Sequence, residues 1–475
     1  MSRIISVLAA LFLAFPLAAQ EVTSGMLVGS WEGALDAGAM KLRIGFVLKE
    51  NDKKELTGTM FSIDQGNVAI TLDKTVIKGR EVRLQMTRQG ISYIGTLNDA
   101  GDTLTGHWLQ GLGKLPLTLK KVPGLTKLNR PQEPKPPFPY RSEDVTYENT
   151  DAKVKLAGTL TLPAGNGHFP AVLLITGSGP QDRDEAILGH KPFLIIADYL
   201  TRRGIAVLRV DDRGIGKSTG SFATATTFDF ASDVQAGVRY LASRPEIDKQ
   251  RIGLIGHSEG GIIAPLVASK TSDIAFIVLL AGTGLPGDEI IYLQGRLIAK
   301  AGGAKEADLE ASATIQRVLF GAIKAEKPGP ELVKKLKELL KAEVAKLTPE
   351  QKKEMDKAGG IAQAEASLLT FTVPWFKTFI THDPVPVLKQ VKCPVLALNG
   401  ELDLQVPYKE NLSAIEAALK AGGNKDYTIK SFPQLNHLFQ TARTGAPSEY
   451  GTIEETFNPA VLQIMGDWIT ERVKR

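Results

Sequence analysis

Cysteine and histidine are scarce in this 475-residue chain, and their scarcity argues against two kinds of site. Because Cys393 is the only cysteine, no internal disulfide can form and stability must come from the core. Cys393 stands before Pro394 at the start of an apolar run, which favours a buried structural thiol. The six histidines are scattered, with no His or Cys pair at the spacing of zinc ligands. We expect neither a metal site nor a cofactor.

An excess of charge of one sign is also lacking. The chain has 57 Lys and Arg residues against 52 Asp and Glu residues, a formal net charge of +5, and no segment concentrates it. This balance argues against nucleic acid as a partner. The proportions of hydrophobic residues (43%) and charged residues (23%) are ordinary for a globular protein. The length allows two or three domains.

The N-terminus differs from the rest of the chain. A single positive charge at Arg3 is followed by an apolar run over residues 4–17 and by the small residues Ala18 and Ala19. This pattern predicts a signal peptide over residues 1–20, because the run is short for a membrane span. We expect a periplasmic or secreted protein without stable membrane insertion. A retained N-terminal anchor is the alternative.

Residues 27–121 show short runs in which apolar and polar residues alternate, separated by turns rich in Gly, Asn and Asp. Alternation with period two predicts a small antiparallel sandwich or barrel. Trp31 and Trp108 lie near the first and last of these runs. We favour packing at a barrel end for both side chains over a place in a ligand-binding mouth.

A proline-rich linker over residues 122–139, with five prolines between positions 129 and 139, separates this segment from the next. Residues 140–475 then alternate between apolar strand-like runs and helix-like stretches, which predicts a mostly parallel sheet covered on both faces. The alternation stops between about residues 285 and 385, where apolar residues recur at helical spacing. This stretch is expected to form a helical cap over the sheet. The strand-like runs cover residues 171–175, 205–210, 252–255, 275–280 and 395–398.

The pentapeptide from Gly256 to Gly260 has the pattern G-x-S-x-G, with Ser258 at its centre. An apolar run precedes it and a helix-like run follows it, as expected of a nucleophile elbow. Small residues are needed two positions before and after the serine, because a Cβ there would collide with the crossing strand and helix. Ser258 is therefore the candidate nucleophile.

A serine nucleophile needs a base and an acid that orients the base. Asp403 follows a strand-like run and enters the predicted site; Glu401 is the rival acid, nearer the strand end. His437 lies in a loop before the last helix and is the candidate base. The order Ser258, Asp403, His437 is that of α/β-hydrolases and differs from those of chymotrypsin and subtilisin.

The oxyanion of an acyl-transfer reaction needs N–H donors. The backbone N–H of Glu259 is expected to supply one. The second should come from the glycine-containing loop after the strand at 171–175, where we choose the N–H of Ser178, with Gly177 and Gly179 as alternatives. His257 adjoins the nucleophile and is expected to pack or hydrogen bond beneath the elbow.

Residues 211–218 end like a phosphate-binding loop, but Asp211 stands where the first glycine is required, and two acidic residues would repel a phosphate. We interpret the segment as a structural turn in which Arg213 forms an internal ion pair.

Together these motifs resemble exported bacterial α/β-hydrolases, close to EstD-type esterases and to serine aminopeptidase-like (S33-type) hydrolases. The resemblance covers residues 140–475 and implies Ser258 as nucleophile, His437 as base and Asp403 as its orienter. It also implies an N-terminal β-rich domain. In one departure from the superfamily, Thr176 stands where a His-Gly oxyanion motif would place its histidine. The motifs are at residues 176–184, 211–218, 256–260, 400–407 and 436–437.

The function that follows is a serine hydrolase that cleaves short- to medium-chain carboxylic esters of small molecules through an acyl-enzyme intermediate. A peptidase or amidase of S33 type is the first alternative, since the same triad cleaves amides; such an aminopeptidase should present acidic cap residues to an α-ammonium group. A non-catalytic ligand-binding protein is the second. The aromatic residues of segment 375–379 (Trp375, Phe376 and Phe379) are expected either to line the substrate pocket or to pack the cap on the sheet.

Overall fold

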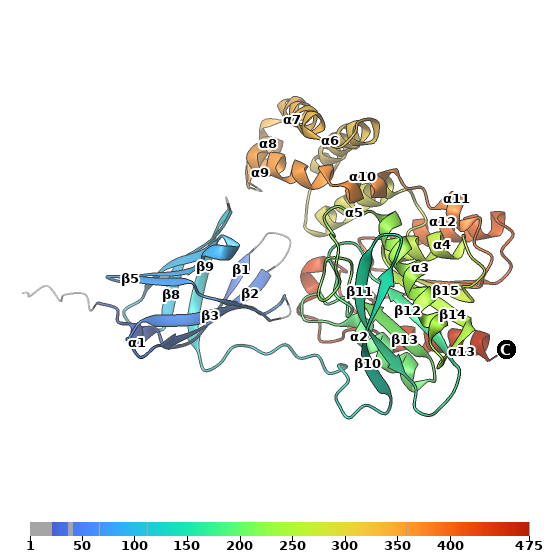
Figure 1. Ribbon diagram of the computed structural model, residues 1–475. Helices are drawn as coiled ribbons and strands as arrows, with labels where there is room; N and C mark the ends of the chain where they lie inside the picture. The colour runs from blue at the N-terminus through green and yellow to red at the C-terminus, as the bar shows by residue number, and fades with distance from the viewer. Residues whose placement is uncertain (1–20, 37–40, 66, 112, 358, 475) are drawn as a thin grey trace, which may run out of the picture. The chain divides into compact units, whose positions relative to one another are not determined.

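The computed structural model describes residues 21–36, 41–65, 67–111, 113–357 and 359–474. The predicted signal peptide over residues 1–20 lies outside the described residues. The chain forms two compact units: the first contains nearly all of strands β1–β9, and the second contains strands β10–β17 and the chain from Lys127 onward. Figure 1 shows both. Among the residues described, no helix has the length and apolar character needed to cross a membrane.

The first unit is one curled sheet of antiparallel strands, built from the alternating runs that the sequence shows. Two meanders, β1–β4 and β5–β9, are joined by antiparallel pairing of β1 with β9. The elements are α1 Ser24–Leu27, β1 Gly29–Asp36, β2 Lys41–Glu50, β3 Leu56–Ser62, β4 Val68–Thr71, β5 Lys74–Lys78, β6 Glu81–Met86, a 3₁₀ turn at Thr87–Gln89, β7 Ile91–Leu97, β8 Thr103–Gln110 and β9 Gly113–Val122.

The two tryptophans of this unit belong to its core. Trp31 is fully buried and donates its indole N–H to the backbone oxygen of Leu27 at 2.7 Å. Trp108 is 4% exposed and packs in the same cluster as Phe46 and Tyr93. Burial of both rings favours the packing interpretation over a ligand-binding mouth.

The proline-rich segment is not a free spacer along its whole length. The Arg130 guanidinium donates hydrogen bonds to the backbone oxygens of Leu188, Gly451 and Ile453. Gln132 similarly bonds to the backbone at Phe457. These donors satisfy carbonyl groups of the second unit, so the chain from Lys127 onward packs with that unit.

The second unit has an eight-stranded sheet in the order β10-β11-β13-β12-β14-β15-β16-β17. The pairs from β13 to β17 are parallel, and β10 and β11 form an antiparallel hairpin at one edge. This order and the helices on both faces confirm the predicted α/β-hydrolase fold. The strands are β10 Arg141–Asn149, β11 Val154–Leu162, β12 Phe169–Ile175, β13 Ala206–Val210, β14 Ile247–His257, β15 Phe276–Leu280, β16 Val395–Gly400 and β17 Tyr427–Phe432.

The central strands are apolar at successive positions because both faces of the sheet are buried. Leu173 faces a core with α3, α4 and α12, whereas Val172 and Leu174 face a core with α2 and α13. Helix α3 begins with a capping box in which Thr226 and Asp229 bond reciprocally. The helices are α2 Pro192–Arg202, α3 Thr227–Ser243, α4 Gly260–Ala268, α12 Tyr408–Ala421 and α13 Pro459–Val473, with a 3₁₀ turn at Pro447–Glu449.

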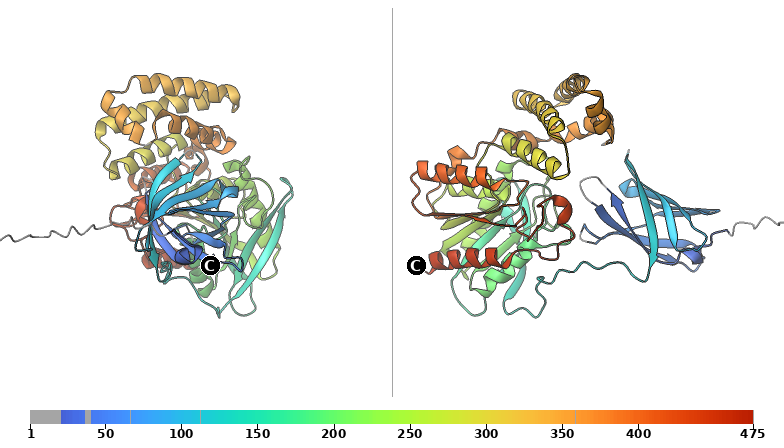
Figure 2. Two further views of the ribbon diagram at one scale, coloured as in Figure 1. Left: turned by 90° about the vertical axis from the view of Figure 1, so that its left-hand side faces the viewer. Right: turned by 180° about the vertical axis from the view of Figure 1, so that it is seen from behind.

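A helical cap is inserted between β15 and β16, as the sequence predicts. Helices α5 and α10 lie next to the sheet, and α6–α9 form an outer layer (Figures 1 and 2). Leu332, Leu336 and Leu340 recur at helical spacing on α7 and are buried. The cap elements are α5 Gly287–Ala301, α6 Glu306–Ala325, α7 Pro330–Ala345, α8 Pro349–Lys357, α9 Gly360–Ser367, a 3₁₀ turn at Leu368–Thr372, α10 Pro374–Thr381 and α11 Val385–Leu388.

Cys393, at the entry to β16, is partly buried. Burial raises the pKa of its thiol to about 12, so the thiolate is scarce at neutral pH. The thiol is therefore a structural group, as predicted.

Candidate active site

Ser258 lies on the turn between β14 and α4, where its φ of 52° is in the left-handed region. A non-glycine residue rarely adopts that conformation unless its surroundings enforce it. A Cβ on Gly256 would lie 2.0 Å from the backbone oxygen of Gly260, and a Cβ on Gly260 would lie 2.2 Å from that of Ile175. Both glycines are therefore required, and the elbow geometry predicted from the pentapeptide is present.

The structure pairs His437 with Asp403. Nδ1 of His437 lies 2.8 Å from Oδ2 of Asp403, and both residues are buried. The other carboxylate oxygen accepts hydrogen bonds from the backbone N–H groups of Gln405 and Val406, at 2.8 Å each. Because Nδ1 is bonded to the carboxylate, Nε2 is the nitrogen that can take a proton from a serine.

The rival acid does not reach the histidine. Glu401 accepts a hydrogen bond from the hydroxyl of Ser431 at the surface of the protein. Ser258, His437 and the loop that contains Ser178 line a common pocket. They all follow the carboxyl ends of parallel strands, where open α/β sheets bind ligands.

The oxyanion loop, residues 176–185, follows β12. Its Gly177 N–H already donates to the Glu185 carboxylate at 2.7 Å. Of the three donors considered from the sequence, Ser178 therefore stays the preferred one, and Gly177 is occupied. Thr176, at the position of the missing oxyanion histidine, donates its hydroxyl to Asp212 at 2.8 Å and ties the loop to the end of β13.

His257 hydrogen bonds beneath the elbow, as expected. Its Nδ1 lies 2.9 Å from the Glu185 carboxylate, and its Nε2 lies 3.0 Å from the backbone oxygen of His437. Both nitrogens face oxygen atoms. Burial lowers the pKa of His257, but Glu185, the backbone oxygen of His437 and Asp403 together outweigh burial and raise the pKa above its ordinary value. His257 and Glu185 form a buried hydrogen-bonded pair.

The side chain of Glu259 has a place that its sequence motif does not predict. One carboxylate oxygen accepts hydrogen bonds from the Thr227 hydroxyl at 2.7 Å and from the Trp375 indole N–H at 2.8 Å. Burial raises the pKa of Glu259, and hydrogen bonds from Thr227, Trp375 and, most weakly, the Ser178 side chain lower it in part. The residue after the nucleophile is thus bonded to α3 and to the cap.

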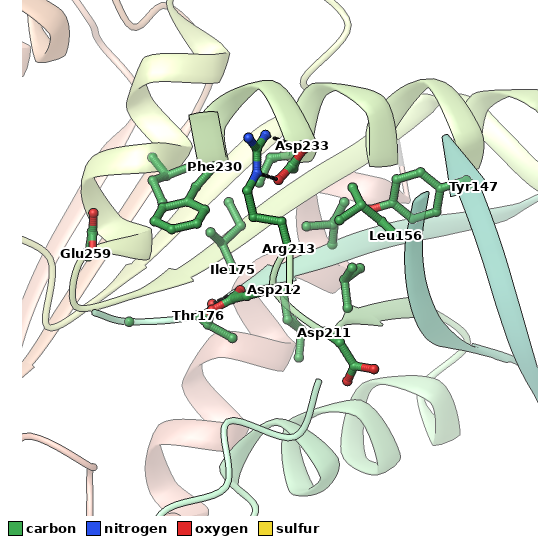
Figure 3. Close-up of a pocket in the computed structure, with 16 residues that line it drawn as sticks. Tyr147, Leu156, Ile175, Thr176, Asp211, Asp212, Arg213, Phe230, Asp233 and Glu259 are labelled. Carbon is green, nitrogen blue, oxygen red and sulfur yellow. Dashed lines mark hydrogen bonds and ion pairs between the residues drawn. The ribbon is translucent and has the colours of Figure 1, made fainter. Parts of the chain in front are cut away.

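A second, smaller cavity of about 40 Å³ lies behind the oxyanion loop, and Figure 3 shows its lining. Asp212, beside Thr176 in that view, is partly buried, and burial raises the pKa of its carboxyl to about 7. Arg213 does not face a phosphate but pairs with Asp233 through two hydrogen bonds of 2.7 and 2.8 Å. The predicted structural turn with an internal ion pair is confirmed.

The reaction pocket has a volume of about 240 Å³. The cap contributes five side chains to its lining, none of them charged, and no Lys or Arg lines it among the described residues. Of the predicted aromatic segment, Trp375 and Phe379 line the pocket, whereas Phe376 packs in the cap core. The five cap residues are Ile290, Ile291, Gln294, Trp375 and Phe379.

In the part of the chain that the structure describes, no cluster of three or more His, Cys, Asp or Glu side chains has the arrangement of a metal site.

Comparison with known proteins places this arrangement in a family. Residues 151–432 match the X-Pro dipeptidyl-peptidase (S15) family. The chain belongs to the S15 family. The matched region contains Ser258 and Asp403 and ends before His437. The esterase EstD of Thermotoga maritima is 27% identical over 308 residues, which are 64% of this chain and 63% of EstD. The resemblance to EstD-type hydrolases is thus confirmed.

Two further proteins are similar to this chain. The esterase FrsA of Vibrio cholerae is 31% identical over 136 residues, 29% of each chain. The solved structure of the Pyrococcus furiosus esterase Pf2001 aligns with 73% of this chain and 98% of its own, with 17% identity and a TM-score of 0.43. The chain spans less than two thirds of the length of EstD, the curated relative with the longest of these matches.

Proposed function

We propose that this S15-family protein is a serine hydrolase that cleaves short- to medium-chain carboxylic esters of small molecules. The observation that carries the proposal is the pocket itself: it brings the strained Ser258 together with the His437–Asp403 pair under a cap wall without charge. At about 240 Å³ the pocket is smaller than the roughly 300–1,000 Å³ typical of drug-sized ligands, which favours a small substrate.

The chemistry would follow from the hydrogen bonds. Nε2 of His437 takes the Ser258 proton as the hydroxyl oxygen attacks the ester carbonyl. The N–H groups of Ser178 and Glu259 stabilise the oxyanion, and loss of one such donor typically costs about 2.7–4 kcal/mol of barrier. His437 then protonates the leaving alcohol, and a water activated by the same base releases the acyl group from the serine.

Peptidase activity is the second candidate, because the S15 family takes its name from X-Pro dipeptidyl-peptidases. A peptidase that recognises a free N-terminus needs an acidic group for the α-ammonium. The cap offers none to the pocket, and Glu259 already accepts hydrogen bonds from Thr227 and Trp375. The names of EstD and FrsA also favour an esterase. An S33-type aminopeptidase would need the same ammonium site.

We further propose that residues 1–20 direct export, so that the enzyme acts in the periplasm or outside the cell. The sequence pattern at the N-terminus supports this proposal. Fractionation of cells that express the full chain, with N-terminal sequencing of the product, tests it. An intact Met1 on a cell-internal product would contradict it.

The reaction is tested by comparing the wild-type protein with Ser258→Ala on p-nitrophenyl acyl esters and on p-nitroanilides of amino acids and of X-Pro dipeptides. We expect turnover of the esters, strongest at short acyl chains, that disappears in Ser258→Ala. Serine-dependent turnover of the anilides in preference to the esters would overturn the esterase proposal in favour of a peptidase. Inactivity on both panels would favour a ligand-binding protein.

A further inference from the structure

Three acidic side chains lie at the oxyanion loop, and they come from three different parts of the chain: Glu185 and Glu259 are buried, and Asp212 is partly buried. Glu185 holds the Gly177 N–H, and Asp212 holds the Thr176 hydroxyl and the Gln181 N–H. Glu259 lines both the reaction pocket and the smaller cavity. Burying acidic side chains so close together is costly, and nothing in the proton transfers of the proposed reaction requires Glu259.

Glu259 differs from the other two carboxylates in its contact with the cap. Its hydrogen bond from Trp375 joins residues 116 positions apart in the sequence, and the bond from Thr227 reaches the first turn of α3. The backbone N–H of the same residue is the proposed oxyanion donor. Glu259 is only 2% exposed, so water cannot solvate its carboxylate. The hydrogen bonds from Thr227 and Trp375 take the place of hydrogen bonds from water.

We propose that the Glu259 side chain is a positioning residue that fixes the oxyanion donors and couples them to the cap. Trp375 on α10 and Thr227 on α3 hold the carboxylate, and the carboxylate holds the first turn of α4, where the Glu259 N–H lies. The Trp375 ring also lines the pocket, so a cap residue that faces the substrate holds the same residue whose N–H is the proposed oxyanion donor. This inference rests on the proposed serine hydrolase function.

The kinetic constants of variants can distinguish a positioning role of Glu259 from a purely structural role. A structural acid would affect folding and substrate affinity alike. A positioning residue for the oxyanion should affect the transition state most, because the negative charge on the oxygen develops only there. The effect should therefore fall on kcat rather than on KM.

The test uses the full chain with p-nitrophenyl butyrate as substrate. Glu259→Gln keeps the size of the side chain, and Trp375→Phe removes the indole N–H while it keeps an aromatic ring. We expect Glu259→Gln to lower kcat by about tenfold to a hundredfold, with KM within about threefold of wild type. Trp375→Phe should lower kcat in the same direction, and the double variant should be no slower than Glu259→Gln alone.

A second readout reports on the oxyanion hole directly. A trifluoromethyl ketone forms a tetrahedral oxyanion with the serine, so its inhibition constant should rise in Glu259→Gln by about the factor by which kcat/KM falls. The matched control is Tyr292→Phe, which removes one hydroxyl from α5, bonded to Arg317 outside the pocket. That variant should leave kcat and the inhibition constant unchanged.

Several results would overturn the inference. If the wild type hydrolyses the ester but Trp375→Phe and Glu259→Gln keep its kcat, the contacts do not position the oxyanion donors. The same holds if the variant effects are additive or fall on KM alone. Should Glu259→Gln fail to fold, Trp375→Phe decides, because it leaves the carboxylate in place. A wild type without activity on any ester would overturn the proposed function and the inference with it.

Discussion

The ring of His257 holds the loop of His437, because Nε2 of His257 lies 3.0 Å from the backbone oxygen of His437. The residue next to the nucleophile is therefore a support for the candidate base and not a base itself. Its other ring nitrogen is bound by Glu185, which also accepts the Gly177 N–H of the oxyanion loop. One buried hydrogen-bonded pair thus links the elbow, the candidate base and the oxyanion loop.

The first prediction concerns this buried pair. His257→Gln removes the imidazole and leaves the buried Glu185 side chain without its partner, and an unsatisfied buried polar group typically costs about 1–3 kcal/mol of stability. We expect a lower melting temperature and a kcat reduced by about tenfold or more, because the His437 loop loses a fixed contact. Calorimetry and ester kinetics on the same preparation check both effects. An active variant with wild-type melting temperature would contradict the prediction.

The second prediction compares the two acids near the end of β16. Asp403→Asn leaves the shape of the side chain but no longer holds His437 in the required tautomer, so kcat should fall by about 10⁴-fold. Glu401→Gln is the matched control, since Glu401 bonds to Ser431 at the surface. Its kcat should stay within about twofold of wild type. Equal losses in the two variants would mean that Asp403 is not the orienting acid.

The sequence predicts well those short motifs whose geometry depends only on neighbouring residues. The elbow at Ser258 is set by residues within two positions, and the order of Ser258, Asp403 and His437 follows from their places after strands. The central strands were also predicted, because burial on both faces makes them continuously apolar. The sequence does not single out strands β10, β11 and β17. Strands β10 and β17 form the two edges of the sheet, and both mix polar with apolar residues.

Contacts between distant residues are what the sequence leaves open. Glu185 lies 72 positions from His257, and nothing in the loop around it marks its carboxylate as buried. The Glu259 side chain is bonded to Trp375 across an insertion whose packing no periodicity specifies. The pairing of Arg213 was expected, but its partner Asp233 becomes evident only when α3 is placed on the sheet.

The third prediction follows from the carboxyl of Asp212, whose pKa burial raises to about 7 from its ordinary value of 3.8, with help from the charges of Glu259 and Glu185. Between about pH 4 and pH 7 the folded protein keeps a proton that the unfolded chain has released. The contribution of this group to the free energy of unfolding is therefore present at low pH and is lost as the pH rises through that window.

Asp212→Asn abolishes this dependence, because the amide does not titrate. The variant loses one acceptor for Thr176 or Gln181, a cost that does not change with pH. We expect its melting temperature, relative to wild type, to become more favourable from pH 5 to pH 8. Thermal unfolding at four pH values in that range measures the difference. A difference that is constant or changes in the opposite direction would show that Asp212 ionises normally in the fold.

The last prediction contrasts two glycines in helices of the same unit. A methyl group on Gly260 would lie 2.2 Å from the Ile175 oxygen, so β12 and α4 must separate at the elbow. We expect Gly260→Ala to cost at least about 1–3 kcal/mol of stability and to abolish ester hydrolysis, since the shift also displaces Ser258. Gly321, exposed within α6, has nothing within 4 Å of the added carbon. Gly321→Ala should therefore stabilise the protein by about 0.5–1 kcal/mol with unchanged activity. Both changes add one methyl group to a helix, so denaturant unfolding of the two variants separates the effect of elbow geometry from that of helix propensity. Equal changes in the free energy of unfolding would refute the strand–helix contact as the reason for glycine at position 260.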